Sequence, residues 1–405
     1  MRLLKIFCYN VGAFWMNHKI RLAGESKFWS RFEFRIAFFA LLVRLPFVIY
    51  DGLYNSDVPD EYHCPDYDLW IDRADVILGG GVIYRDTSYP VRTPPLASYI
   101  LLPPAIFADG HIAAFELYFS LFDVIAAVLL YRIFLRGVGV FKGEVLAKRC
   151  AIFYVFNPFV IASSTLRGQD ESIIVVFFLL FIYFLIQKQY NKAALFLGLG
   201  GLIRPTIGLL LPLLIFAKGT NKERLERLGI TASVVIVGVL PFFILAGSDA
   251  MDMTGRLTSI EGVGILYLLV AHGYDIPLAP FTALFIISYL AISYFVIIKK
   301  IDPWPAALLI ISVFLLAFTK VHSSYYLFAL VFAAPFVLND KKLLVELSAI
   351  FPPAVTFIDI AKSSKHSGEI LYLASGIVAW LIVTVIILHL VLFTWKTSTI
   401  KKNKA

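Results

Sequence analysis

The sequence predicts an all-α, polytopic integral membrane protein. Of its 405 residues, 60% are hydrophobic and only 16% are charged, and the mean hydropathy is +0.81. Apolar stretches recur along the chain and approach the roughly 20 residues that a helix needs to cross a bilayer. We therefore expect a bundle of about 11 to 13 transmembrane helices with one large external loop, rather than a soluble domain around a single core.

Long apolar stretches locate the predicted spans. They lie at 32–50, 112–135, 150–166, 173–187, 193–217, 230–246, 280–298, 303–318, 325–338, 343–360 and 371–395. Two further features are needed if all the basic loops are to lie on one side of the membrane. Residues 95–108 should form a short re-entrant or interfacial helix interrupted at Pro103-Pro104, and residues 193–217 should break at Arg204-Pro205, since proline interrupts a helix.

Basic residues predict the orientation, because short cytoplasmic loops are enriched in Lys and Arg. These loops are the N-terminus, 136–149, 188–192, 218–227, 299–300, 341–342 and 396–404. The expected organisation is a cytoplasmic amphipathic lead-in (1–31), a transmembrane domain (32–395) and a cytoplasmic basic tail (396–405). No apolar core followed by a cleavage site marks a removed signal peptide near the start. The insert 51–95 is then external.

Neither the net charge nor the cysteines indicate another class of protein. The formal charge of +8 is explained by the basic loops and requires no nucleic-acid partner. Cys8, Cys64 and Cys150 are too few and too scattered for a disulfide framework or a metal-ligand set.

The external insert is rich in carboxylates, which is unusual in so apolar a chain. Asp66 and Asp68 begin a predicted amphipathic helix that ends at the glycines 79–81. A carboxylate at a partly dehydrated membrane edge can accept a proton from a hydroxyl as that hydroxyl attacks. The alternative is a solvated loop in which an aspartate caps the helix. Spacing alone leaves both interpretations open.

The loop 248–262, with Asp252, Arg256 and Glu261, is predicted on the same external face, and so are two further polar clusters. One, between two apolar spans, contains Arg167, Gln169, Asp170 and Glu171. A plain turn does not need so many ionisable groups where desolvation is costly, so a functional role is favoured. The other contains Lys320 and His322, which could bind a phosphate or could be interfacial anchors beside tyrosines.

Two charged residues fall within apolar stretches. Arg204 lies at the predicted helix break and Asp123 lies within 112–135. Arg204 suits phosphate binding, whereas Asp123 suits a structural role. A structural ion pair between Arg204 and Asp123 is the alternative.

Several motifs, taken in order, resemble a known family. They include Pro65-Asp66-Tyr67-Asp68, the segment Gly79–Asp86, Tyr89–Pro95, Leu121–Val124 with Leu130–Arg132, Asn157-Pro158-Phe159 through Ser172, and Lys320–Tyr326. Single motifs are weak, but the ordered series is much more specific. It resembles the multi-spanning GT-C glycosyltransferases, and within them the family that adds the first mannose in GPI-anchor assembly, with its prokaryotic relatives.

The resemblance implies an enzyme. It would move a hexose, most simply mannose, from a polyprenyl- or dolichyl-phosphate carrier to a lipid-linked or membrane-proximal acceptor hydroxyl, with inversion at the anomeric carbon. The family's acidic signature Asp-x-Asp-Tyr places its second Asp on Asp66 and its Tyr on Tyr67, whereas its first Asp falls on Cys64. Asp66 is therefore the implied base, and a one-residue shift would use Asp68 instead.

The resemblance also implies the surroundings of the reaction. Arg167, Gln169, Asp170, Glu171, Arg204, Lys320 and His322 would bind substrate, and no metal or other cofactor is expected because cations can neutralise the leaving phosphate. The protein would lie among membrane lipids, in the plasma membrane of a prokaryote or the endoplasmic reticulum of a eukaryote, with both termini cytoplasmic. A partner subunit stays an open question.

Two other classes compete with the enzyme. A transporter or lipid-linked-sugar flippase would also be polytopic, but transporters place charges at the midplane of broken helices and often contain inverted repeats. A non-catalytic subunit of an assembly complex would not require so many acids in one loop. Ionisable clusters at one end of the spans favour the enzyme.

Overall fold

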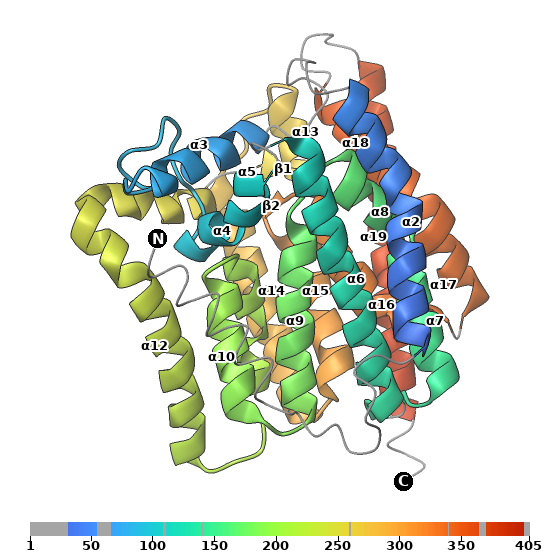
Figure 1. Ribbon diagram of the computed structural model, residues 1–405. Coiled ribbons are helices and arrows are strands. Elements are labelled where there is room, and N and C mark those ends of the chain that lie inside the picture. The colour runs from blue at the N-terminus through green and yellow to red at the C-terminus, as the bar shows by residue number, and fades with distance from the viewer. Residues whose placement is uncertain are drawn as a thin grey trace. The chain divides into compact units, whose positions relative to one another are not determined.

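The computed structural model describes residues 31–54, 66–107, 111–139, 141–258, 261–338, 340–363 and 370–400. Its contacts divide the chain into residues 1–35 and a larger compact unit, residues 36–405. The fold and the site described below belong to the larger unit, which is built almost entirely of helices (Figure 1).

The α-helices are α2 (Arg31–Tyr54), α3 (Tyr67–Leu78), α4 (Pro95–Ile100), α5 (Leu102–Ile106), α6 (Ile112–Arg136), α7 (Glu144–Val155), α8 (Pro158–Ile161), α9 (Glu171–Ile186), α10 (Tyr190–Gly201), α11 (Leu211–Ile215), α12 (Asn221–Ala246), α13 (Ile265–Ala271), α14 (Leu278–Ile298), α15 (Pro303–Ala317), α16 (Tyr326–Val337), α17 (Lys341–Val345), α18 (Phe351–Ser363) and α19 (Ile370–Ile400). Short 3-10 or π-helical segments are η2 (Ala162–Leu166), η3 (Pro205–Leu210), η4 (Gly247–Thr258), η5 (Ser323–Tyr325) and η6 (Glu346–Ile350), and the strands are β1 (Glu261–Gly262) and β2 (Lys320–Val321).

Helices occupy every predicted apolar stretch, so the predicted all-α polytopic membrane fold is confirmed. Within the described residues, five helices are long and apolar enough to cross a membrane, or six if α7 and the segment after it, bent by 48°, form one broken span. Shorter apolar helices lie in most of the remaining stretches: α9, η3 with α11, α15, and η5 with α16. The stretch 343–360 is occupied by α17, η6 and α18. At 1.5 Å per residue, the 16 residues of α9 extend about 24 Å, which is less than the bilayer core.

Burial separates the core helices from those that face lipid. Most residues of α9 and α15 and all residues of α16 are buried, and α9 contacts both of the others as well as α6 and α10. Helices that are hydrophobic on all sides belong in a protein core or a membrane. By contrast, the most apolar window of α12 contains no buried residue, and that of α14 is only 11% buried. These two helices present apolar side chains outward, as lipid-facing helices do.

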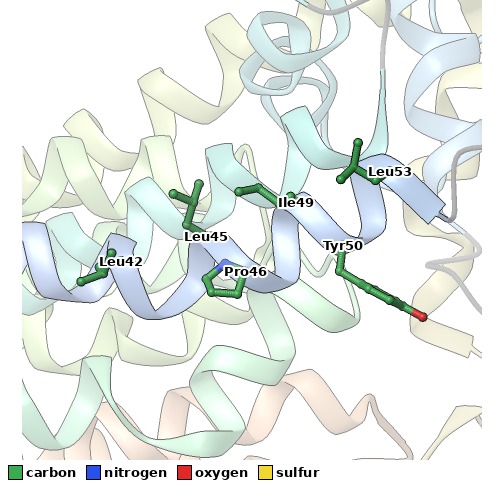
Figure 2. Close-up of a pocket in the computed structure, with 6 residues that line it drawn as sticks. All are labelled: Leu42, Leu45, Pro46, Ile49, Tyr50 and Leu53. Atoms are coloured by element: carbon green, nitrogen blue, oxygen red, sulfur yellow. The ribbon is translucent and has the colours of Figure 1, made fainter.

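The outer face of α2 shows the same property. Figure 2 shows six side chains along this helix, from Leu42 to Leu53, that line a shallow hollow of about 440 Å³. An exposed apolar surface of this kind would be an aggregation risk in water, but it is the expected surface of a helix in hydrocarbon.

Two helix breaks position polar residues at one end of the bundle. The predicted break at Arg204-Pro205 is confirmed, because α10 ends at Gly201 and η3 begins at Pro205. The segment after Pro94 is also split in two, but at Leu101 rather than at Pro103-Pro104. These prolines instead lie inside the first turns of α5, where a missing backbone N–H is tolerated.

A short parallel pairing links two distant loops, which the sequence did not predict. Glu261 pairs with Lys320 and Gly262 pairs with Val321, and the backbone N–H of Val263 donates to Val321 O at 2.6 Å. Gly262 has φ +103, and a Cβ at this position would collide with the backbone of Val321. Glycine is therefore required for this close approach.

Candidate functional site

Arg204 is the centre of a buried polar cluster at the break after α10. Its Nη2 contacts Asp170 Oδ1 closely and lies 3.0 Å from Glu171 Oε1. Its Nη1 donates to the hydroxyl of Tyr325 at 3.1 Å, and its guanidinium lies 5.5 Å from the centre of that ring. We call these four residues, Arg204, Asp170, Glu171 and Tyr325, the Arg204 centre. It joins three segments that are far apart in the sequence.

Local backbone structure places the two acids. Glu171 is the first residue of α9 and Asp170 precedes it, so both carboxylates lie at the positive end of the helix dipole. The π-helical segment η2 ends just before Arg167, and Gly168 adopts φ +50. Gln169 then closes the turn, because its backbone N–H donates to Ser163 O at 2.9 Å and its side-chain Nε2 to Arg167 O at 3.2 Å.

The charges of the Arg204 centre change the predicted role of Arg204. One guanidinium faces two carboxylates, so its charge is already offset. This arrangement favours Arg204 as the residue that holds Asp170 and Glu171 in place, because arginine offers a rigid fork of donors to carboxylates. Binding of a phosphate by Arg204 itself stays a prediction.

Lys320 and His322 lie next to this centre. The His322 ring is 5.2 Å from the ring of Tyr325, and Lys320 is held by the β1–β2 pairing. Lys320 is only 4% exposed, which favours a place within the site over an exposed interfacial anchor, since such a lysine keeps its ammonium in water. The structure therefore brings the two predicted clusters, 167–171 and 320–322, together.

Asp123 belongs to a separate buried cluster. Its Oδ2 lies 3.3 Å from Arg44 Nη2, and its Oδ1 accepts a hydrogen bond from the Tyr154 hydroxyl at 3.0 Å. The side chains of Arg44 and Asp123 are 1% and 0% exposed. The predicted alternative of an Arg204–Asp123 ion pair is wrong, because each residue has a different partner.

Asp66 and Asp68 lie at the start of the short helix α3. Asp66 occupies the N-cap position in an αR conformation and makes no side-chain capping bond, whereas Asp68 is exposed. The helix-cap interpretation of Asp66 is therefore not what the geometry favours, since a capping aspartate accepts a bond from the first turn. The carboxyl group of Asp66 is half-buried at the start of α3. Cys64 lies outside the described residues.

Aromatic contacts fix α3 against the start of α6. Trp70 stacks on Phe115 with ring centres 5.3 Å apart, and Tyr67 meets the same ring edge-on at 5.5 Å. Burial raises the pKa of Tyr67, with a smaller contribution from the Asp68 charge, so its phenol stays protonated at neutral pH. The predicted helix and its end at Gly79 are confirmed.

Other acids of the insert stabilise the loop itself. Asp72 Oδ2 accepts a bond from Ser88 N at 2.9 Å. Asp86 accepts bonds from Arg85 Nε and Val82 N, both at 2.7 Å. The Arg85 side chain and the Val82 N–H lower the pKa of Asp86 to about 2. Part of the acidic content of this loop is therefore structural.

Arg73 is a candidate that the sequence analysis missed. It is buried on α3, and its Nη1 lies 3.4 Å from the Thr93 hydroxyl. Seven residues separate it from Asp66, so the two lie on the same face of α3. The sequence contains that spacing, but an arginine in a polar insert does not indicate a functional site until its burial is known.

The polar segments share one end of the bundle but form two groups of contacts. The loop that contains Tyr84 packs on Ala246 and Ala250 at the end of α12, and α3 packs on the start of α6. The Arg204 centre is built instead on α9, η3 and η5. Asp66 belongs to the first group and Arg204 to the second. The residues predicted to form a single site therefore do not all contact one another directly.

Among the residues that the structure describes, no group of three or more His, Cys, Asp or Glu side chains is placed to hold a metal ion. The expectation that the protein works without a metal stays a prediction.

Together, the fold and these clusters define a polytopic membrane protein. One end of its bundle carries an ion-paired centre and the short acidic helix α3. A family model described as GPI transamidase subunit PIG-U matches residues 83–273, slightly less than half of the chain.

Curated relatives carry a different name. A GPI mannosyltransferase 1 of Dictyostelium discoideum is 31% identical over 159 residues, which are 39% of this chain and 34% of the relative. Those of Kluyveromyces lactis and Saccharomyces cerevisiae are 30% and 25% identical, over 40% and 41% of this chain and 38% and 39% of the relatives. The alignments thus span a little over a third of each relative. They confirm the resemblance to the GPI-anchor mannosyltransferase family.

Proposed function

We propose that the protein is an inverting hexosyltransferase, with mannose as the sugar. The observation that carries the proposal is the convergence of segments 167–171 and 320–325 around Arg204, at the end of the bundle where the acidic helix α3 also lies. Matches to proteins named GPI mannosyltransferase 1 support the sugar and the reaction class. The donor is a polyprenyl- or dolichyl-phosphate sugar, and the acceptor is a lipid-linked or glycan hydroxyl.

In this proposal Asp66 is the general base. It accepts the proton of the acceptor hydroxyl while that oxygen attacks the anomeric carbon from the side opposite the phosphate. The bond between the anomeric carbon and the phosphate oxygen breaks, the polyprenyl phosphate leaves with the bonding electrons, and the configuration inverts. Asp68 is the second candidate for the base.

The remaining site residues act on the leaving group and its position. Arg167, Lys320 and His322 offset the charge that develops on the phosphate, which is most effective in a site of low dielectric constant. Arg204 holds Asp170 and Glu171, and Gln169 keeps the turn that carries Arg167. The isoprenoid tail lies against the apolar helices.

The proposed setting is supported by the basic loops, the apolar helices and the names of the relatives. The protein crosses the membrane several times with both termini cytoplasmic, and the site faces the lumen or the exterior. The printed names of the relatives suggest a glycolipid acceptor of the GPI type and the endoplasmic reticulum, or the plasma membrane in a prokaryote.

One observation favours a second candidate, a non-catalytic subunit of a larger complex. The family model named for a transamidase subunit matches residues 83–273, a region that contains Arg167 and Arg204 but not Asp66. A transferase needs a base in the external loop, whereas a subunit of this kind does not.

The test is direct. Purified protein is incubated with radiolabelled polyprenyl-phosphate mannose and a membrane lipid extract, and transfer of label to a new lipid product is measured. The proposal predicts transfer by the wild type and by Asp75→Asn, an exposed acid on the same helix, and strongly reduced transfer by Asp66→Asn. Absence of transfer by well-folded wild type, together with co-purification of other subunits, would support the second candidate.

A further inference from the structure

A second polar feature lies at the opposite end of the bundle from the Arg204 centre. It is a cavity of about 670 Å³ at the ends of α9, α11 and α14, a volume within the usual range for ligand pockets. Helix α9 connects the two features, since Glu171 is its first residue and Ile186, its last, lines the cavity. About 24 Å of helix therefore separates them.

The lining of this cavity combines cations with an apolar wall. Lys188, Lys218, Arg224 and Lys300 come from three segments that are far apart in the sequence, and Asp302 is the one acid among the described lining residues. Basic residues are common in loops at the cytoplasmic ends of spans. Here, however, they surround one volume rather than being spread over the surface.

The backbone at two of these lysines supports a specific role. Lys188 and Lys300 have φ values of 59° and 49°, and they are the only non-glycine residues with positive φ in the described part of the chain. Each follows the end of a helix, where glycine is the usual residue in this conformation. Both line the same cavity. Unfavourable backbone conformations concentrate at functional sites.

Arg227 makes the wall of the cavity rigid. Its Nη2 donates to Lys218 O at 2.7 Å and its Nη1 to Ala217 O at 3.3 Å, and its guanidinium stacks 4.0 Å over the ring of Tyr190. Ala217, Lys218 and Tyr190 all line the cavity. The next helix begins with a capping box between Thr220 and Glu223, which fixes the same loop.

The apolar residues that line the cavity, and the level of the cavity relative to the membrane, indicate the class of ligand. Leu213, Phe216 and Ile297 face the cavity, and Ile297 lies one residue before the end of α14, a helix long enough to span the membrane. The cavity is thus at the level where hydrocarbon meets headgroups. We propose that it binds an anionic membrane lipid, with the lipid phosphate among the four cations and an acyl chain along the apolar wall.

The site is tested with purified full-length protein in detergent, by native mass spectrometry with dioleoyl phosphatidic acid, dioleoyl phosphatidylcholine or glycerol 3-phosphate. Lys188→Gln with Lys218→Gln should weaken phosphatidic acid binding by about tenfold or more, since each lysine near an anionic lipid contributes about fivefold. Lys222→Gln, an exposed lysine in the same region that does not line the cavity, should leave binding unchanged.

A second variant tests the same site without removing a cation. Phe216 is 51% exposed, so Phe216→Glu should fold normally, yet it adds a negative charge to the cavity and should also weaken phosphatidic acid binding. The proposal would be overturned if the Lys188→Gln, Lys218→Gln double variant and Phe216→Glu bound phosphatidic acid as strongly as the wild type. Retention of phosphatidylcholine, or of glycerol 3-phosphate, as strongly as phosphatidic acid would also overturn it. The lipid site does not depend on mannosyl transfer, so the two proposals can fail separately.

Discussion

Two arginines lie among apolar helices, and they differ in burial and in the number of carboxylates that they meet. Arg44 meets a single carboxylate, Asp123, and both side chains are almost fully buried. Arg204 meets two carboxylates at a helix break, and the side chains of Arg204 and Asp170 are 12% and 10% exposed. A closed pair of one arginine and one acid is suited to holding helices together, whereas an arginine that faces two carboxyl groups and has some access to solvent is suited to chemistry.

The largest expected effect is on stability, at the closed pair. Arg44→Ala leaves the Asp123 carboxylate buried without its partner and should lower the free energy of unfolding by about 3 to 5 kcal/mol. Folded yield and thermal unfolding in detergent measure this loss. In the Arg44→Ala background, Asp123→Asn removes the unpaired charge and should recover part of the stability. No recovery would show that Asp123 is not the group that Arg44 stabilises.

The next effect is on turnover, at the acidic helix. Asp66→Asn should reduce transfer by about 10²-fold or more, the usual scale for loss of a positioned base, with an unchanged unfolding temperature because Asp66 makes no capping bond. Asp68→Asn should retain most activity. If instead Asp68→Asn is inactive and Asp66→Asn is active, the base has been assigned to the wrong aspartate.

A smaller effect is expected beside the Arg204 centre. His322→Ala removes a ring that contacts Tyr325 and should raise the KM for the lipid donor or lower kcat by about tenfold, the scale for one charge-assisted contact to phosphate. Steady-state kinetics at varied donor concentration separate the two effects. Unchanged donor kinetics in folded protein would exclude His322 from donor binding.

The sequence analysis predicted the local breaks and helix ends around these two arginines, but it did not predict which distant acids they contact. A polar interruption between apolar runs, a proline after Arg204 and three glycines after α3 are local signals, and the corresponding breaks and helix end are present. The partner of Arg204 lies 34 residues away and that of Asp123 lies 79 residues away. Nothing in helical periodicity specifies which of several buried acids a buried arginine will meet, because pairing depends on how the helices pack.

Cysteine labelling should disturb the protein least, because it tests only on which side of the membrane a residue lies. Cysteines introduced at the exposed positions Ser88 and Ser248, in a protein whose Cys8 and Cys64 are replaced by serine, should react together with an impermeant reagent from outside intact cells. A cysteine at Lys222 should react only after permeabilisation. Reaction of just one of the external pair would contradict a shared external face.

The most direct test of the central claim is mannose transfer per mole of folded protein for Arg204→Lys and Arg44→Lys. Lysine keeps the charge but loses the planar fork of donors. We expect Arg204→Lys to fold with nearly normal yield and to transfer about tenfold less mannose, because Asp170 and Glu171 lose their shared support. Arg44→Lys should unfold at a lower temperature and yet transfer at the wild-type rate per folded molecule. The reverse pattern, or an equal loss of activity in both variants, would contradict the distinction between a structural pair and a functional centre.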